Sequence, residues 1–404
     1  MKKYRRLMIL LVINIAMFLI PTYRATAYNE DLTVENGIME SSEENKALEE
    51  EVGKEIQGLY EYINKMKLDV ELMNELDPSE YLKSYIRDGK GNLSFGEISK
   101  AVVSLLFKEV GSVLKLVISI VVIAILSTLL KNLQDAFESK GISQIAFYAC
   151  YAVIIMLLSK SFLISLSVAK NVINDIANFM AAILPVLVTM IGLAGGFVEA
   201  ATIDPIIMAS VVIVPRIYVS VIIPMIMIVF VLQFANNLSD EHKIGNLCKL
   251  VKQWVVWLQG IIITVFISLL TIRGITSTTI DAVALKTTKF AVDNFVPIVG
   301  KAFSDAITSV AAYSLIIKNA ISGIGLVVII LLILYPVLKL VLMSFVYKLS
   351  SALIEPISDK RITASIASAG DAMVLLLSCV LSVSLMFFVL LGIMATAGKF
   401  IVGG

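Results

Sequence analysis

Histidine and cysteine are scarce in this sequence, and their scarcity excludes several kinds of site. His242 is the single histidine, and the three cysteines are Cys150, Cys248 and Cys379. A structural zinc site needs four Cys or His ligands at short spacing, and three widely separated cysteines form no disulfide framework. A lone histidine also leaves no Ser-His-Asp arrangement. The sequence therefore predicts no metal site, no cofactor and no catalytic residue, and we expect a protein that is not an enzyme.

Charged residues are few as well, at 16%, whereas hydrophobic residues make up 58% of the chain. Soluble domains typically carry ~25% charged and ~45–50% apolar residues. This imbalance predicts an all-α, polytopic membrane protein. No basic stripe is interleaved with aromatic residues, which excludes nucleic-acid binding. The glycine-rich Gly192–Gly196 lacks the Lys-Ser/Thr pair of a phosphate-binding loop, so any ATP-driven step must come from a partner.

The first thirty residues have the three parts of a secretory signal peptide. Met1–Arg6 is basic, Leu7–Ile20 is apolar, and Ala25–Ala27 is a small-x-small cleavage pattern. Fourteen apolar residues are fewer than the ~20 that a membrane span needs. We expect cleavage between Ala27 and Tyr28; the alternative is an uncleaved anchor. Either interpretation places the following residues outside the cytoplasm.

Residues 28–109 form an acidic segment, with 19 acidic and 9 basic residues. From Lys46 to Leu76, apolar residues recur at steps of three and four, which predicts an amphipathic helix. Asp77 and Pro78 can start the next helix as its cap and first residue. We expect 28–109 to be a helical extracytoplasmic segment that leads into the membrane.

Residues 110–404 contain the apolar runs of a multi-span membrane domain, which are Gly111–Leu130, Gln144–Val168, Ala177–Val198, Ile203–Phe234, Trp254–Ile272, Ile321–Leu353 and Met373–Ala397. The fourth and sixth runs exceed one span and contain prolines, so each can be two short helices or one tilted helix. We expect seven to nine transmembrane helices, some of them broken at these prolines where freed backbone groups face protein or water.

Two pairs of prolines suggest an internal repeat. Pro185 matches Pro297, Pro224 matches Pro336, and both matches have the same spacing of 112 residues. A polar loop and a further apolar run follow each second proline. We infer repeats at 177–274 and 290–399, an arrangement typical of transporter and channel folds.

Ionisable residues at membrane depth are the candidate functional residues, because their burial there is costly. Arg216 directly follows Pro215 in mid-run, and Asp293, Lys301 and Asp305 lie in the polar stretch before the sixth run. Each can line a pathway or serve a structural role. The remaining candidates are Lys160, Glu199, Asp204, Lys339 and Lys348. For these, snorkelling or a structural ion pair is the alternative.

Four segments carry a resemblance to a known family: LSDEHKIGNL (Leu238–Leu247), DNFVPIVGKAFSDA (Asp293–Ala306), IIKNAI (Ile316–Ile321) and YKLSSALIEPI (Tyr347–Ile357). They are similar to segments of the stage III sporulation protein AE family of endospore-forming Firmicutes. The resemblance covers most of the chain and transfers no catalytic residue.

The resemblance implies a role and a set of partners. Members of this family belong to a complex in the mother-cell membrane that surrounds the forespore, with extracytoplasmic parts in the intermembrane space. The implied function is a secretion-like channel, or feeding tube, needed for late forespore gene expression. Implied partners are membrane lipid, other stage III sporulation subunits, a companion secretion-type ATPase and a forespore membrane protein. The alternatives are an autonomous secondary transporter and a membrane scaffold that assembles the complex.

Overall fold

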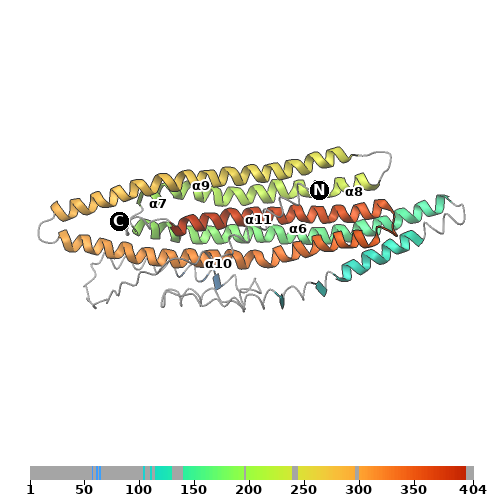
Figure 1. Ribbon diagram of the computed structural model, residues 1–404, viewed down its shortest axis with the longest axis horizontal. Helices are drawn as coiled ribbons and strands as arrows, with labels where there is room; N and C mark the ends of the chain where they lie inside the picture. The colour runs from blue at the N-terminus through green and yellow to red at the C-terminus, as the bar shows by residue number, and fades with distance from the viewer. Residues whose placement is uncertain are drawn as a thin grey trace. The chain divides into compact units, whose positions relative to one another are not determined.

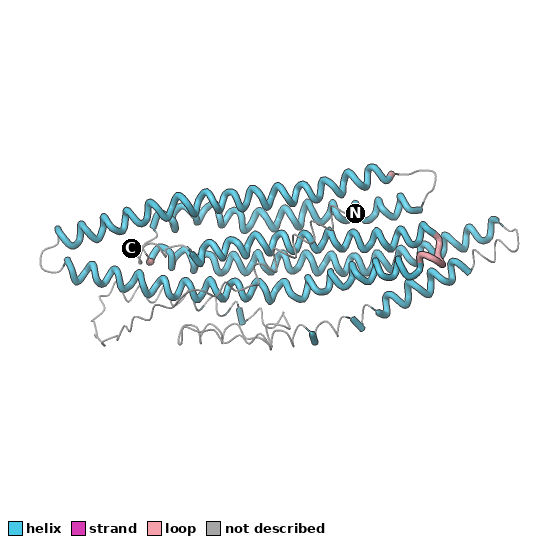
Figure 2. Tube along the Cα trace, viewed as in Figure 1, coloured by secondary structure: helices cyan, strands magenta, loops and turns pink. Residues whose placement is uncertain are grey.

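The computed structural model describes residues 114–129, 140–194, 197–238, 244–295 and 300–396, with a few isolated residues before 114. Within these ranges the chain is helical and contains no strand (Figure 2). The signal peptide with Ala27 and Tyr28, and nearly all of 28–109, lie outside the described residues.

Six α-helices and one π-helical turn follow one another in the second part of the chain (Figure 1). They are α6 (Lys140–Leu193), α7 (Phe197–Ile217), η1 (Tyr218–Ile222), α8 (Ile223–Leu238), α9 (Gly245–Phe295), α10 (Gly300–Ile354) and α11 (Lys360–Thr396). A shorter apolar helix, Leu114–Leu129, precedes them. Five helical stretches in the described residues are long and apolar enough to cross a membrane. The protein is therefore an all-α polytopic membrane protein.

The expected seven to nine spans included separate spans at 144–168 and 177–198, which the structure joins in α6. The polar residues between them remain helical because one face of this segment is buried. The buried residues, at the spacing of a helix face, are Ala169, Val172, Ile173 and Ile176. Each long run with prolines is also one continuous helical stretch. Pro336 lies inside α10, and 203–234 runs through α7, η1 and α8.

The π-helical turn has a local cause in the proline pattern. Proline lacks the backbone N–H that an α-helix requires, and Pro215 and Pro224 stand on either side of η1. In η1 the backbone N–H of Ile223 donates to the carbonyl of Tyr218. The wider turn preserves the direction of the helix while changing its hydrogen-bond pattern, as π-bulges do elsewhere. The expected break at these prolines is thus a π-turn between α7 and α8.

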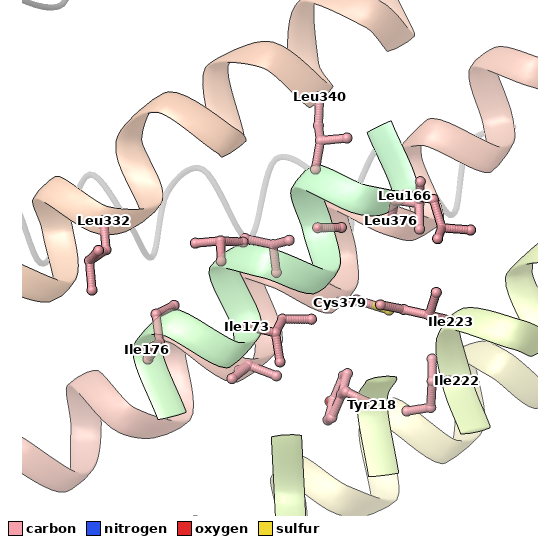
Figure 3. Close-up of a cluster of buried hydrophobic side chains, with 14 of the residues drawn as sticks. Leu166, Ile173, Ile176, Tyr218, Ile222, Ile223, Leu332, Leu340, Leu376 and Cys379 are labelled. Atoms are coloured by element: carbon pink, nitrogen blue, oxygen red, sulfur yellow. The ribbon is translucent and has the colours of Figure 1, made fainter. Parts of the chain in front are cut away.

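The helix α11 lies at the centre of the packing. In the most apolar 18-residue stretch of α11, 61% of the residues are buried. The corresponding stretch of α9 has 22% of its residues buried. The core that surrounds it includes Tyr218 and Ile223 from the η1–α8 junction, Ile173 from α6 and Leu340 from α10 (Figure 3). Most of this stretch of α9 is therefore left exposed.

Side-chain contacts fix the helix directions. Residue numbers increase in the same direction along α9 and α11, so these two helices are parallel. The contacts are Lys252 with Asp371, Gln259 with Cys379, and Phe266 with Phe387. Along α10 and α11 the residue numbers increase in opposite directions, so these two helices are antiparallel. The contacts are Ser351 with Thr363, Ser344 with Gly370, and Lys318 with Ala395.

The helix α8 is also antiparallel to α11. Asn237 of α8 contacts Ser368, and Ile223 lies beside Cys379 in Figure 3. The two proline-matched segments of the predicted repeat, in α8 and α10, therefore have the same direction.

The turn between α10 and α11 follows from its sequence. Pro356 cannot donate a backbone hydrogen bond and disfavours a helical Glu355, so α10 ends at Ile354. Asp359 then caps α11, because its Oδ1 accepts the backbone N–H of Arg361 at 2.9 Å. This short turn aligns α10 and α11 side by side.

Three of the helices are longer than a bilayer requires. With 54, 51 and 55 residues, α6, α9 and α10 each measure about 80 Å at 1.5 Å per residue, against ~30 Å of hydrocarbon. Lys318 contacts Ala395 at the end of α11, so residues 300–317 of α10 continue past that end. The polar stretch Arg273–Ala311 thus extends α9 and α10 over its described residues.

Gly370 permits the close approach of α10 to α11. A Cβ atom there would lie 3.1 Å from Lys348 Cγ and 3.3 Å from the carbonyl oxygen of Ser344. We expect Gly370→Val to lower the free energy of unfolding by about 1–3 kcal/mol, because overpacking forces the two backbones apart. Thermal unfolding of the detergent-purified protein measures this change.

The matched control is Gly392→Val in the same helix, since a Cβ atom at Gly392 meets nothing within 4 Å. Both variants carry the same helix-propensity cost, so their difference isolates packing. Equal stability of the two variants would contradict the close approach at Gly370.

Candidate functional site: a polar stripe along α11

A stripe of polar side chains follows one broad face of α11 inside the apolar bundle. Its members are Ser365, Ser368, Asp371, Ser378, Cys379 and Ser382, and we call them the α11 polar stripe. Residues at such spacing share one side of a helix. Each member contacts a polar side chain from another helix. The stripe therefore receives polar groups from α6, α8, α9 and α10.

At its start, the stripe contacts α6 and α8. The hydroxyls of Tyr151 and Ser365 are 2.8 Å apart, and Tyr151 also lies 3.3 Å from the carbonyl oxygen of Phe234. The side-chain amide of Asn237 donates to Ser368 Oγ at 3.3 Å. Tyr151 is 2% exposed, so its hydroxyl needs these partners to offset the loss of water.

Asp371 lies between two lysines from different helices. Its Oδ2 is 3.0 Å from Lys252 Nζ of α9, and its Oδ1 is 3.4 Å from Lys348 Nζ of α10. All three side chains are partly exposed, at 44%, 26% and 50% respectively. One carboxylate with two ammonium groups leaves a local charge of +1. This cluster joins α9, α10 and α11.

Gln259 of α9 makes the deepest contacts with the stripe. Its Oε1 accepts the hydroxyls of Ser378 at 3.0 Å and Ser382 at 3.4 Å, and its Nε2 donates to Cys379 Sγ at 3.3 Å. Gln259 is 5% exposed and Cys379 is fully buried. Polar side chains of this kind hold helices together within a membrane. They also supply the groups with which a pathway coordinates a polar solute.

Arg216, predicted as a candidate, lies on the outer side of the bundle and away from the stripe. It lines a pocket of about 260 Å³ between α6 and the α7–η1 junction. Asn174 and Asn178 of α6 and Ser220 of η1 line the same pocket. The structure thus joins a predicted arginine to polar residues that sequence reasoning did not select.

The other predicted charges are dispersed. Lys160 is exposed on α6, Lys348 contacts Asp371, and Lys339 donates to the hydroxyl of its own helix neighbour Tyr335 at 2.9 Å. The side chains of Glu199, Asp204, Asp293, Lys301 and Asp305 lie outside the described residues. Asp293 belongs to α9, and Lys301 and Asp305 belong to the first turns of α10.

Lys318 is a buried cation that sequence reasoning missed. It is fully buried, and its Nζ donates to the carbonyl oxygen of Ala395 at 3.2 Å. That carbonyl belongs to the last turn of α11, where backbone acceptors lack helical donors and carry partial negative charge. Its place in the segment IIKNAI, directly before a long apolar run, was the available signal.

Neither a metal centre nor a catalytic arrangement is visible in the part of the chain that the structure describes. No three His, Cys, Asp or Glu side chains gather there as metal ligands. The three cysteines form no disulfide, and the Sγ of Cys379 accepts a hydrogen bond from Gln259. The chemistry available to the site is hydrogen bonding and charge attraction.

Comparison with known proteins gives these features a context. The sequence profile of the family described as stage III sporulation protein AE matches residues 76–398. The chain is also 27% identical to "Stage III sporulation protein AE" of Bacillus subtilis (strain 168) over 312 residues, which cover 77% of this chain and 78% of that protein. No solved structure matches the chain. Since the profile spans most of the chain, including every helix of the bundle, this protein belongs to the stage III sporulation protein AE family.

Proposed function

We propose that this chain is the polytopic membrane subunit of a secretion-like channel, or feeding tube, between mother cell and forespore. In this role it sits in the mother-cell membrane around the forespore, with residues 28–109 in the intermembrane space. It sustains late forespore gene expression together with other stage III sporulation subunits. A companion secretion-type ATPase supplies energy, and a forespore membrane protein meets the complex from the other side. The chain itself performs no catalytic step.

The observation that carries this proposal is the α11 polar stripe. Polar side chains inside a membrane bundle either hold helices together or line a path for polar solutes. Six polar residues of the central helix form the stripe, and polar groups from four other helices contact them. Polar groups at membrane depth mark solute pathways or the switches that open them. We infer that the stripe lies on, or controls, the path through the complex.

A leucine at Gln259 tests the stripe without breaking the fold. Each serine hydroxyl has one hydrogen to donate. Within α11 the carbonyls of Leu375 at 2.7 Å from Ser378 Oγ and of Ser378 at 2.6 Å from Ser382 Oγ can accept it, so both hydroxyls keep an acceptor when Gln259 is removed. We expect Gln259→Leu to leave the protein level unchanged and to lower late forespore transcription in a sporulating host. Alanine at Asp293, Lys301 or Asp305 belongs in the same assay, because we propose these charges as pathway residues.

The results separate the three functions that the sequence allows. Lost transcription with a normal protein level supports the channel. Normal transcription in all four variants, together with failure of a variant that lacks residues 46–109, supports a scaffold instead. Proton- or sodium-dependent uptake by the purified chain alone, reconstituted in vesicles, supports an autonomous transporter.

A further inference from the structure

The pocket beside Arg216 combines polar and apolar side chains on the outer side of the bundle. Its volume is about 260 Å³, below the ~300–1,000 Å³ of sites for drug-sized ligands. Asn174, Asn178 and Ser220 line the pocket together with Arg216, and all four residues are exposed. No acidic side chain is among the described residues that line it. The pocket therefore offers hydrogen-bond donors and one fixed positive charge.

Arg216 lies at the depth of the apolar surface. On its own helix, exposed Val212 and Ile213 precede it and exposed Val221 follows it. Tyr218 and Cys379 belong to the same buried core cluster (Figure 3), and Cys379 contacts Gln259. Gln259 in turn lies between Trp257 and Ile261, which are 65% and 54% exposed. Apolar side chains thus face outward at the level of Arg216 on both α7 and α9.

A cation at this depth requires a compensating group. Unpaired charges within the hydrocarbon are costly, and those that persist are paired or lie beside water-filled cavities. Arg216 forms no ion pair with any residue in the described part of the chain. By contrast, Lys318, Lys339 and Lys348 all have partners from their own chain. Among the described side chains, none therefore compensates the charge of Arg216.

We propose that this pocket binds the phosphate group of an anionic ligand. The planar guanidinium of Arg216 matches two phosphate oxygens at once. The side-chain amides of Asn174 and Asn178 and the hydroxyl of Ser220 supply further donors. The headgroup of an anionic phospholipid and a small phosphate share this chemistry. The site is independent of the channel role and remains testable if that role fails.

Ligand-dependent thermal stability of the full-length protein in detergent tests this site. The probes are phosphatidylglycerol, diacylglycerol as the lipid without phosphate, and sodium phosphate against sodium chloride at equal ionic strength. We expect phosphatidylglycerol or phosphate to raise the unfolding temperature of the wild type, and diacylglycerol to have no effect. In R216Q, half-maximal stabilisation should need an about 10- to 100-fold higher ligand concentration, as for one lost charged hydrogen bond.

Two further variants keep the test independent of folding. Lys160→Gln removes an exposed charge from α6 outside the pocket and should respond like the wild type. Asn178→Ala retains Arg216 and should weaken the response less than R216Q does. Stabilisation by phosphatidylglycerol alone identifies a lipid headgroup, and equal stabilisation by sodium phosphate identifies a small ion. An equal response of R216Q and wild type, or no response from either ligand, would overturn the phosphate site.

Discussion

Replacing Lys318 by alanine is expected to lower the free energy of unfolding by about 2–4 kcal/mol, the range for truncating a large buried side chain. Lys318 is fully buried, and its ammonium group donates to the carbonyl of Ala395 at 3.2 Å. Alanine leaves a cavity between α10 and α11 and deprives the end of α11 of a donor. Thermal unfolding in detergent gives the stability, and hydrogen exchange at residues 390–396 shows whether the last turn of α11 frays.

Lys318→Met separates the two contributions. Methionine retains most of the volume and removes the charge, and replacing a buried charge by an apolar side chain is often tolerated when the partner is not left charged. We expect the methionine variant to be more stable than the alanine variant while still showing faster exchange near Ala395. Wild-type exchange rates in both variants would contradict the role of Lys318 at the end of α11.

The helical membrane fold was predictable because its signal is the length of the apolar runs. Hydropathy located every helix of the bundle, since a run of about 20 apolar residues matches the thickness of the hydrocarbon core. It failed to join 144–168 to 177–198, because Lys170, Asn171, Asn174 and Asp175 look like a loop in a hydropathy plot. In the structure these polar residues occupy one face of α6, and the buried residues between them keep the helical spacing.

The site was harder to predict than the fold, for a reason seen in α11. Serine hardly alters the hydropathy of an apolar run, so Ser365, Ser378 and Ser382 gave no signal. Their meaning depends on Gln259 and Tyr151, which lie more than 100 residues away in the sequence. Arg216 was found because an arginine in an apolar run is conspicuous by itself. Lys318 was missed because its burial depends on where α11 ends.

Neutralising Asp371 is expected to cost about 1–3 kcal/mol of stability, a value between those for exposed and for buried ion pairs. Asparagine has nearly the same shape as aspartate, so packing is retained in Asp371→Asn. The change leaves Lys252 and Lys348 facing each other with no carboxylate between them, whereas in the wild type their Nζ atoms lie 3.0 and 3.4 Å from it. Repulsion between the lysines should loosen α9 and α10 from α11.

The salt dependence of the unfolding temperature distinguishes charge from packing. Added salt screens repulsion between partly exposed lysines, so Asp371→Asn should recover stability at high ionic strength more than the wild type gains. Lys348→Met combined with Asp371→Asn removes one of the two repelling charges and should restore part of the loss. Glu355→Gln, an exposed acid in the turn after α10, is the matched control and should change stability little. A loss in Asp371→Asn that neither salt nor Lys348→Met relieves would show that Asp371 acts through hydrogen bonding to the helices instead of through its charge.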